Sequence, residues 1–193
     1  MRGERVLLRD GSVVRIRQVQ PGDAPLLTEG FTRLSTESRR LRFLTGKPSL
    51  NAAELRFLTE VDHHDHEALG AVDPVDGGGL GIARFIRDTE NGTRAEVAVT
   101  VIDDWQRRGL ATELLNRLAD RGRKLGIRHF IALVAADNAA VVGLLQDHRG
   151  VRVTHRESGT VEYEITLPAR GLGDGLHALL RAFGGAHLGD ERG

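Results

Sequence analysis

The hydrophobic period of this chain changes at Gly109. From Ala95 to Ile102 apolar and polar residues roughly alternate, as in a half-buried strand. Beyond Gly109 the apolar residues recur every three or four positions: Ala111, Leu114, Leu115, Leu118, Ala119 and Leu125. This spacing predicts an amphipathic helix that Gly126 ends. A strand, a loop and a helix in direct succession predict an α/β fold, with a ligand expected at the loop.

Strand-like runs lie on both sides of this step. The turn dipeptide Asp10-Gly11 predicts an opening hairpin over Val6 to Val19. Glycine-rich or Asn-Gly breaks separate three runs that predict an antiparallel meander: Ala68 to Val72, Leu80 to Ile86 and Ala95 to Ile102. Downstream we expect a short strand, His129 to Val134, and a closing hairpin over Val151 to Leu167. Strands mixed with helices in this order favour an α/β (α+β) sheet over a doubly wound one.

Three further helices are indicated by their start signals. Asp23 can cap a helix that carries Ala24, Leu27, Phe31 and Leu34 on one face. Asn51 with Glu54 three residues later is a capping-box arrangement, for a helix ending near Val61. Asn138 can cap a helix that runs to about Gln146.

The length of the chain favours one domain and a tail. We place the domain at residues 1–167, because 193 residues bury one core but fall short of two full domains. Residues 168–193 are rich in glycine and contain one possible apolar helix, Leu176 to Phe183. The tail is therefore either a docked helix or a flexible extension.

Composition excludes several kinds of chemistry. Lys and Arg number 27, as do Asp and Glu, so bulk charge gives no reason to expect a nucleic-acid or membrane partner. The absence of cysteine excludes disulfides, zinc-thiolate sites and a cysteine acyl-enzyme, which favours direct transfer chemistry. Met1 to Gly11 lacks the apolar core of a signal peptide, and no segment is long and apolar enough to span a bilayer. We therefore expect a cytoplasmic protein, either a monomer or a homodimer.

The loop Gln106 to Ala111 has the composition of an anion site. Main-chain N–H groups before a helix and in its first turn have no helical acceptor, and the helix dipole favours negative charge there. Gly109 allows close approach of a phosphate, and Arg107 and Arg108 can add charge-assisted contacts. These residues alone fit an ordinary solvated helix N-terminus equally well.

The same loop resembles the cofactor loop of the GNAT superfamily of acyl-CoA-dependent N-acetyltransferases. That loop has the form Gln/Arg-x-x-Gly-x-Gly/Ala, which Gln106, Gly109 and Ala111 match. Residues 95–101 are similar to the fourth strand of the family, which in many members carries a catalytic glutamate at the position of Glu96. The resemblance covers about residues 13–167.

The resemblance implies a fold, a cofactor and a set of site residues. The fold would be a mixed, mostly antiparallel sheet flanked by helices and splayed between its fourth and fifth strands. Acetyl-CoA would bind, with an asparagine at the position of Asn138 on the pantetheine arm and a main-chain donor near Val99 for the thioester carbonyl. The implied cofactor residues are Val99, Thr100, Val101, Gln106, Arg107, Arg108, Gly109, Leu110, Ala111, Thr112 and Asn138.

A closer resemblance is to the Pat-type bacterial protein lysine acetyltransferases. It is carried by residues 8–12, by the stretch from Leu34-Ser35 to Arg42-Phe43, and by residues 61–69. Members of this group acetylate acyl-CoA synthetases on lysine and often carry a regulatory module, for which this chain has no room. The implied partner is a protein with an acceptor lysine, such as an acyl-CoA synthetase.

Acetyl transfer to an amine needs a base, and Glu96 is the candidate for that base. An amine attacks only when neutral, and a lysine has a pKa of about 10.4, so a base must remove a proton. We expect Glu96 to be that base and to be partly buried among Ala95, Val97 and Ala98. The tyrosine that serves many family members as general acid is absent at the expected spacing, and Tyr163 has a core position in the closing hairpin.

The histidine-rich stretch from Asp62 to His66 contains residue types that bind metal ions. Consecutive residues point in different directions, and acyl transfer needs no metal, so we expect a polar loop and no metal ligand. One of its histidines could border the amine channel.

Three functions remain open from the sequence. The first is acetyl transfer to a protein lysine, and the second is acetyl transfer to a small amine. The third is a non-catalytic acyl-CoA-binding regulatory domain, against which Glu96 argues.

Overall fold

The computed structural model of the protein describes residues 3–43, 47–137, 150–157, 159–173, 177 and 180. These residues build one eight-stranded sheet in the order β1-β2-β3-β4-β5-β6-β8-β7. The strands are β1 Glu4–Leu7, β2 Val13–Gln18, β3 His66–Val72, β4 Gly79–Arg87, β5 Arg94–Val101, β6 His129–Ala135, β7 Val151–Glu157 and β8 Thr160–Thr166. All neighbours pair antiparallel except β5 and β6, which are parallel. The predicted hairpins, the meander and the mixed sheet are confirmed.

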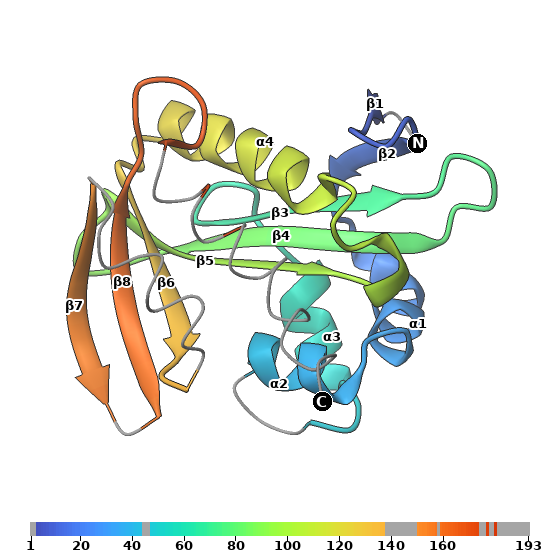
Figure 1. Ribbon diagram of the computed structural model, residues 1–193, viewed down its shortest axis with the longest axis horizontal. Coiled ribbons are helices and arrows are strands. Elements are labelled where there is room, and N and C mark those ends of the chain that lie inside the picture. Colours follow the sequence, from blue (N-terminus) through green and yellow to red (C-terminus); the bar gives the residue numbers. More distant parts are fainter. Residues whose placement is uncertain are drawn as a thin grey trace, which may run out of the picture.

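Helices cover both faces of the sheet. In Figure 1, α4 (Leu110–Lys124) lies along one face, while α1 (Ala24–Thr32), α2 (Thr36–Phe43) and α3 (Ala52–Thr59) lie on the other. The short 3-10 helices η1 (Pro21–Asp23) and η2 (Asp103–Trp105) precede α1 and α4. Helix α2 was not predicted, because its sequence TESRRLRF has no apolar stripe.

The two predicted helix starts on this side differ in detail. At Asn51 the capping box is confirmed: its side chain accepts from the Glu54 amide at 3.0 Å, and Glu54 accepts from the Asn51 amide at 2.8 Å. Asp23 occupies the N-cap position of α1, but its side chain makes no cap hydrogen bond. Its carboxylate instead forms a buried ion pair with Arg17, with contacts of 2.6 and 2.7 Å, and accepts from the Gln20 amide.

The main core lies between α4 and the sheet. Four leucines of α4 are almost fully buried: Leu110, Leu114, Leu115 and Leu118. Each contributes about 2 kcal/mol through burial of apolar surface. They pack with buried strand residues such as Phe85 on β4 and Phe130 on β6, whose rings lie 6.1 Å apart. Tyr163 on β8 is fully buried in the same core, as predicted.

The first residues after Pro168 pack against the domain. Leu172 is 1% exposed and belongs to the core, and Arg123 of α4 donates hydrogen bonds to the carbonyls of Pro168 and Gly171. The predicted helix from Asn138 to Gln146 lies outside the described residues, as does most of the predicted helix from Leu176 to Phe183.

Candidate active site

The two edges of β5 are paired very differently. Along β4, seven residue pairs run from Arg87↔Ala95 to Gly81↔Val101. Along β6, pairing covers three residues and ends at Glu96↔Ile131. Beyond that pair β6 turns away from β5, as Figure 1 shows. With β2 counted as the first strand, β5 and β6 are the fourth and fifth, so the predicted splay is confirmed.

Among the described residues, the main chain of β5 beyond this last pair has no strand partner toward β6, and we call this side, from the Val97 carbonyl to Val101, the open edge. The carbonyl of Thr93, just before β5, accepts from the amides of Arg128 and His129 on this side, at 2.7 and 3.1 Å. Main-chain polar groups alternate between the two edges of a strand. The Val97 N–H makes the last bond of this parallel ladder, so the Val97 C=O and both the N–H and C=O of Val99 face the open edge.

The even-numbered residues of β5 direct their main chain the other way. The Arg94 carbonyl accepts from Asp88, and the Ile102 amide donates to Leu80, both toward β4. By the same alternation the main chain of Thr100 faces β4. Thr100 is therefore separated from the open edge, whereas Val99 and Val101 are on it.

Glu96 stands at the point where β5 and β6 part. It lies opposite Ile86 on β4 and Ile131 on β6. The predicted partial burial is wrong, because the residue is exposed. Its neighbours Ala95 and Val97 pack in the core with α4, so in a strand their side chains point to the opposite face from Glu96 and do not cover it.

The loop before α4 has the backbone of an anion-binding nest. Arg107 and Gly109 have φ angles of +62° and +91°, and Gly109 is the N-cap of α4. A Cβ on Gly109 would lie 3.3 Å from Cγ of Arg9, so both conformation and space favour glycine. The first helical amide with a main-chain acceptor is that of Glu113. Within the described chain, the amides from Arg107 to Thr112 have no main-chain acceptor.

The predicted loop residues have different tasks. The side-chain amide of Gln106 donates to the Val101 carbonyl at 3.2 Å and to Asp103 at 3.1 Å, and lies 3.3 Å from the Ser38 hydroxyl. Gln106 therefore holds the loop against β5 and α2. No sequence pattern marked its partners Ser38 and Asp103. Arg107 is exposed, and Leu110 is buried, so only its main chain can meet a ligand.

Arg108, Ala111 and Thr112 lie in the loop before α4 and in the first turn of that helix. Arg108 lies 4.8 Å from the Trp105 ring centroid and 3.6 Å from the carboxylate of Asp10. Ala111 and Thr112 are half-buried in the first turn of α4. Asn138 lies outside the described residues.

From Glu96 to Val101, just before the loop, β5 covers about 16 Å at the usual rise per residue. An extended ligand can thus reach both the loop and the carboxylate.

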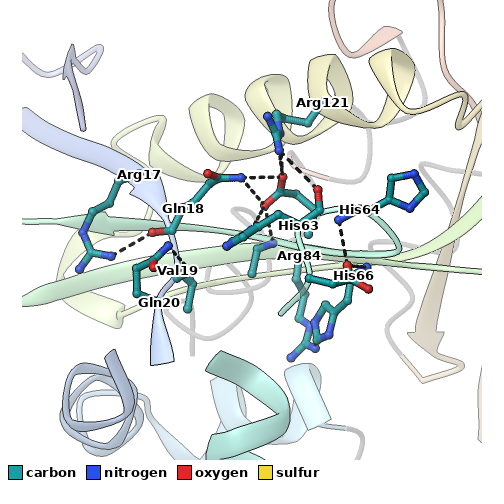
Figure 2. Close-up of polar contacts among 12 residues, drawn as sticks. Arg17, Gln18, Val19, Gln20, His63, His64, His66, Arg84 and Arg121 are labelled. Carbon is teal, nitrogen blue, oxygen red and sulfur yellow. Dashed lines mark hydrogen bonds and ion pairs between the residues drawn. The ribbon is translucent and has the colours of Figure 1, made fainter. Parts of the chain in front are cut away.

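The histidine-rich stretch forms a structural polar network instead. The Asp62 carboxylate accepts from the amides of His64, Asp65 and His66, at 2.8 to 2.9 Å, which closes a tight turn. Figure 2 shows Arg121 reaching from α4 toward this region. No group of three or more His, Cys, Asp or Glu side chains in the described ranges is arranged to hold a metal ion.

Glu67 is the centre of that network. Its carboxylate is fully buried and contacts Arg121 at 2.7 Å, His63 at 2.7 Å and Gln18 at 3.1 Å. These partners come from α4, the turn and β2 (Figure 2). A buried carboxylate needs such compensation, so the network joins α4 to the sheet.

His66 belongs to the opposite face of β3. Its ring lies 5.2 Å from that of Phe57 on α3 and contacts the guanidinium of Arg84. Burial, followed by the charge of Arg84, lowers the pKa of His66 to about 4. At neutral pH His66 is therefore uncharged.

A separate apolar cavity of about 90 Å³ lies between α1, α3 and the sheet. Its lining includes Leu27, Phe31 and Ile82, and the buried Arg17–Asp23 pair borders it. Of the predicted site residues that the structure describes, only Thr100 lines it. We regard it as a packing gap, because it holds neither Glu96 nor the loop before α4.

Comparison with known proteins identifies the family. The Acetyltransferase (GNAT) family model matches residues 33–150, more than half of the chain. The chain therefore belongs to the GNAT family of acetyltransferases. Within the family it is similar to the Acetyltransferase Pat of Mycolicibacterium smegmatis, with 34% identity over 167 residues. That match covers 84% of this chain and 48% of the relative, so the chain spans about half the length of that protein.

Solved structures agree with this placement. The GNAT domain of PAT from S. lividans superposes with a TM-score of 0.75 and 32% identity, covering 86% of this chain and 97% of that one. YncA from Salmonella typhimurium, solved with its cofactor acetyl-CoA, has the same fold at a TM-score of 0.59 and 20% identity, covering 81% and 95% of the two chains. In the part of the chain that is described, no helix is long and apolar enough to cross a membrane.

Proposed function

We propose that this chain transfers the acetyl group of acetyl-CoA directly to a primary amine, the side chain of a protein lysine. The observation that carries this proposal is the open edge of β5. It begins just after Glu96 and leads to a loop of unpaired amides. A carboxylate and an anion-binding loop at the two ends of one exposed strand edge suit a phosphate-bearing thioester and an amine.

The residues fit acetyl-CoA, the cofactor of YncA, in charge and in hydrogen bonding. The amides from Arg107 to Thr112, with the positive end of α4, would hold the diphosphate. The N–H of Val99 would donate to a carbonyl oxygen at the open edge. Asn138 remains a predicted contact of the pantetheine arm. When bound, acetyl-CoA supplies an activated acetyl thioester.

Glu96 would act on the incoming amine. The exposed carboxylate can take a proton from the ammonium or from the attacking nitrogen, directly or through a water. The C–N bond then forms as the C–S bond breaks, and the thiol sulfur leaves with the electron pair. Because a thiol has a pKa of only about 8.5, water can protonate the leaving thiolate and no general acid is required. Tyr163 is fully buried in the core, so we do not expect its hydroxyl to donate this proton.

Similarity to Pat favours a protein lysine over a small amine as acceptor. An acyl-CoA synthetase is the first substrate to test, in keeping with the Pat-like stretches at residues 8–12 and 61–69. A cytoplasmic location and a monomeric or dimeric state remain predictions.

The test of Glu96 compares two exposed glutamates. We expect Glu96→Gln to keep acetyl-CoA affinity by calorimetry and to lower turnover by about 10²-fold or more, the scale of a lost general base. Glu90→Gln, in an exposed turn, makes the same change outside the site and should retain turnover. Equal turnover for both variants would remove Glu96 from the mechanism.

The acceptor is identified by a second assay. Released CoA is followed with either an acyl-CoA synthetase or a panel of small amines as acceptor. Release with the synthetase, and acetyl-lysine in it by mass spectrometry, supports the proposal. Release with a small amine alone would make this chain a small-molecule acetyltransferase. Binding without release in either arm would support a regulatory domain.

A further inference from the structure

The turn between β1 and β2 lies against the loop before α4. The Leu8 amide donates to the Ser12 carbonyl at 2.8 Å, which closes the turn. Glu4 at the start of β1 pairs with Arg117 of α4 at 2.9 Å. Figure 1 shows β1 and β2 beside the N-terminal end of α4. The hairpin is therefore fixed to the same helix whose N-terminus faces the proposed diphosphate.

Arg9 is the residue of this turn that meets the loop. A Cβ on Gly109 would lie 3.3 Å from Cγ, 3.5 Å from Cδ and 3.8 Å from Nε of Arg9. The stem of Arg9 thus packs on the N-cap of α4. This contact brings an arginine from a distant part of the sequence to the loop that carries unpaired amides.

Each aspartate at this loop has a partner other than Arg9 and Arg107, and Asp104 lies 3.9 Å from Arg33. Asp10 pairs with Arg108 at 3.6 Å, and Asp103 accepts from Gln106 and from the Ser35 amide. In the described chain, no carboxylate lies within ion-pairing distance of Arg9 or Arg107. Two exposed guanidinium groups beside unpaired amides favour a multiply charged anion.

We propose that Arg9 binds a phosphate group of the CoA nucleotide and so closes the cofactor loop from the N-terminal hairpin. The inference rests on the proposed function, because it takes CoA as the ligand of the loop. CoA carries two phosphate sources, the diphosphate and the 3′-phosphate. A planar guanidinium suits either one.

The test measures affinity in the full chain by calorimetry. We expect Arg9→Gln to raise the Kd for acetyl-CoA about five- to tenfold, the scale of one exposed charge-assisted contact. Arg5→Gln removes the same charge from β1, away from the loop, and should change the Kd less than twofold. Arg9→Lys should recover part of the affinity, because it keeps the charge but loses the fork. Equal Kd values for wild type and Arg9→Gln, or equal losses for Arg9→Gln and Arg5→Gln, would overturn the inference.

A second ligand identifies the phosphate. With 3′-dephospho-CoA, wild type and Arg9→Gln should bind equally if Arg9 holds the 3′-phosphate, and should keep their difference if it holds the diphosphate. Both results support a phosphate contact. Failure of the wild type to bind acetyl-CoA at all would instead refute the proposed function, so the two failures are distinguishable.

Discussion

The two edges of β5 belong to the same residues but differ in how far they are paired. Toward β4 the strand is paired along its length, and toward β6 pairing stops after Glu96. The first edge fixes the strand, and the second leaves the Val97 carbonyl and both main-chain groups of Val99 without a strand partner among the described residues. The difference shows that one edge of a regular strand can be fully paired while the other offers free polar groups to a ligand, because these groups alternate between the edges.

The largest expected effect comes from removing one donor on the open edge. Val99→Pro deletes the N–H that faces β6 and leaves the β4 hydrogen bonds of neighbouring residues possible. We expect turnover to fall about 10²- to 10³-fold, as for loss of one oxyanion donor. Val99→Ala, which keeps the N–H, serves as the control in the CoA-release assay. Normal turnover in a folded Val99→Pro protein would show that this N–H is not used.

The same substitution one residue earlier tests the paired edge. The main chain of Ala98 faces β4, where it lies opposite Arg84. Ala98→Pro removes a ladder donor within the sheet, so we expect loss of folded protein, seen as a lower urea midpoint than that of Val99→Pro. Equal midpoints would mean that the two edges are not as different as the pairing indicates.

A smaller effect is expected at the loop that ends the open edge. Gly109→Ala must adopt a φ of +91° and place a Cβ 3.3 Å from Arg9. We expect a loss of about 1–2 kcal/mol in stability, from the left-handed backbone, and weaker acetyl-CoA binding. Gly126→Ala, also at positive φ but with open space and at the other end of α4, should lose stability without losing affinity. Equal affinity losses would contradict a role for the loop in binding.

The smallest effect concerns the cavity on the other face of the sheet. Gly30 lies in α1, and a Cβ there would have Ile102 as its nearest atom at 3.9 Å. Gly30→Ala should therefore raise stability by about 0.5–1 kcal/mol through helix propensity and leave turnover unchanged. Thermal melting and CoA release measure the two quantities. A fall in turnover would connect the cavity with the acceptor site.

Sequence patterns predicted the parts of this molecule that depend on side-chain periodicity. The alternation before Gly109 and the stripe after it placed β5 and α4, and the Asn51–Glu54 pair placed α3. Helix α2 was not predicted because half of its residues are charged and they form no apolar stripe. The role of Asp23 was misjudged because the competing partner, Arg17, lies on another element and no local signal reveals it.

Sequence motifs predicted only part of the candidate site. The family resemblance marked Glu96 and the loop, but the exposure of Glu96 depends on which face of β5 it occupies. Arg9 contacts Gly109, which lies 100 positions away in the sequence. The Gln106 side chain contacts Ser38, which lies on a helix that was not predicted. Such contacts arise from tertiary packing, which periodicity does not encode.

Residue-resolved amide hydrogen exchange, with and without acetyl-CoA, tests the central claim most directly. The account predicts that acetyl-CoA slows exchange at Val99 and at the amides from Arg107 to Thr112. Ala98 and Thr100, already bonded to β4, should exchange slowly in both states. Binding of acetyl-CoA with no change at Val99 or the loop would contradict the account.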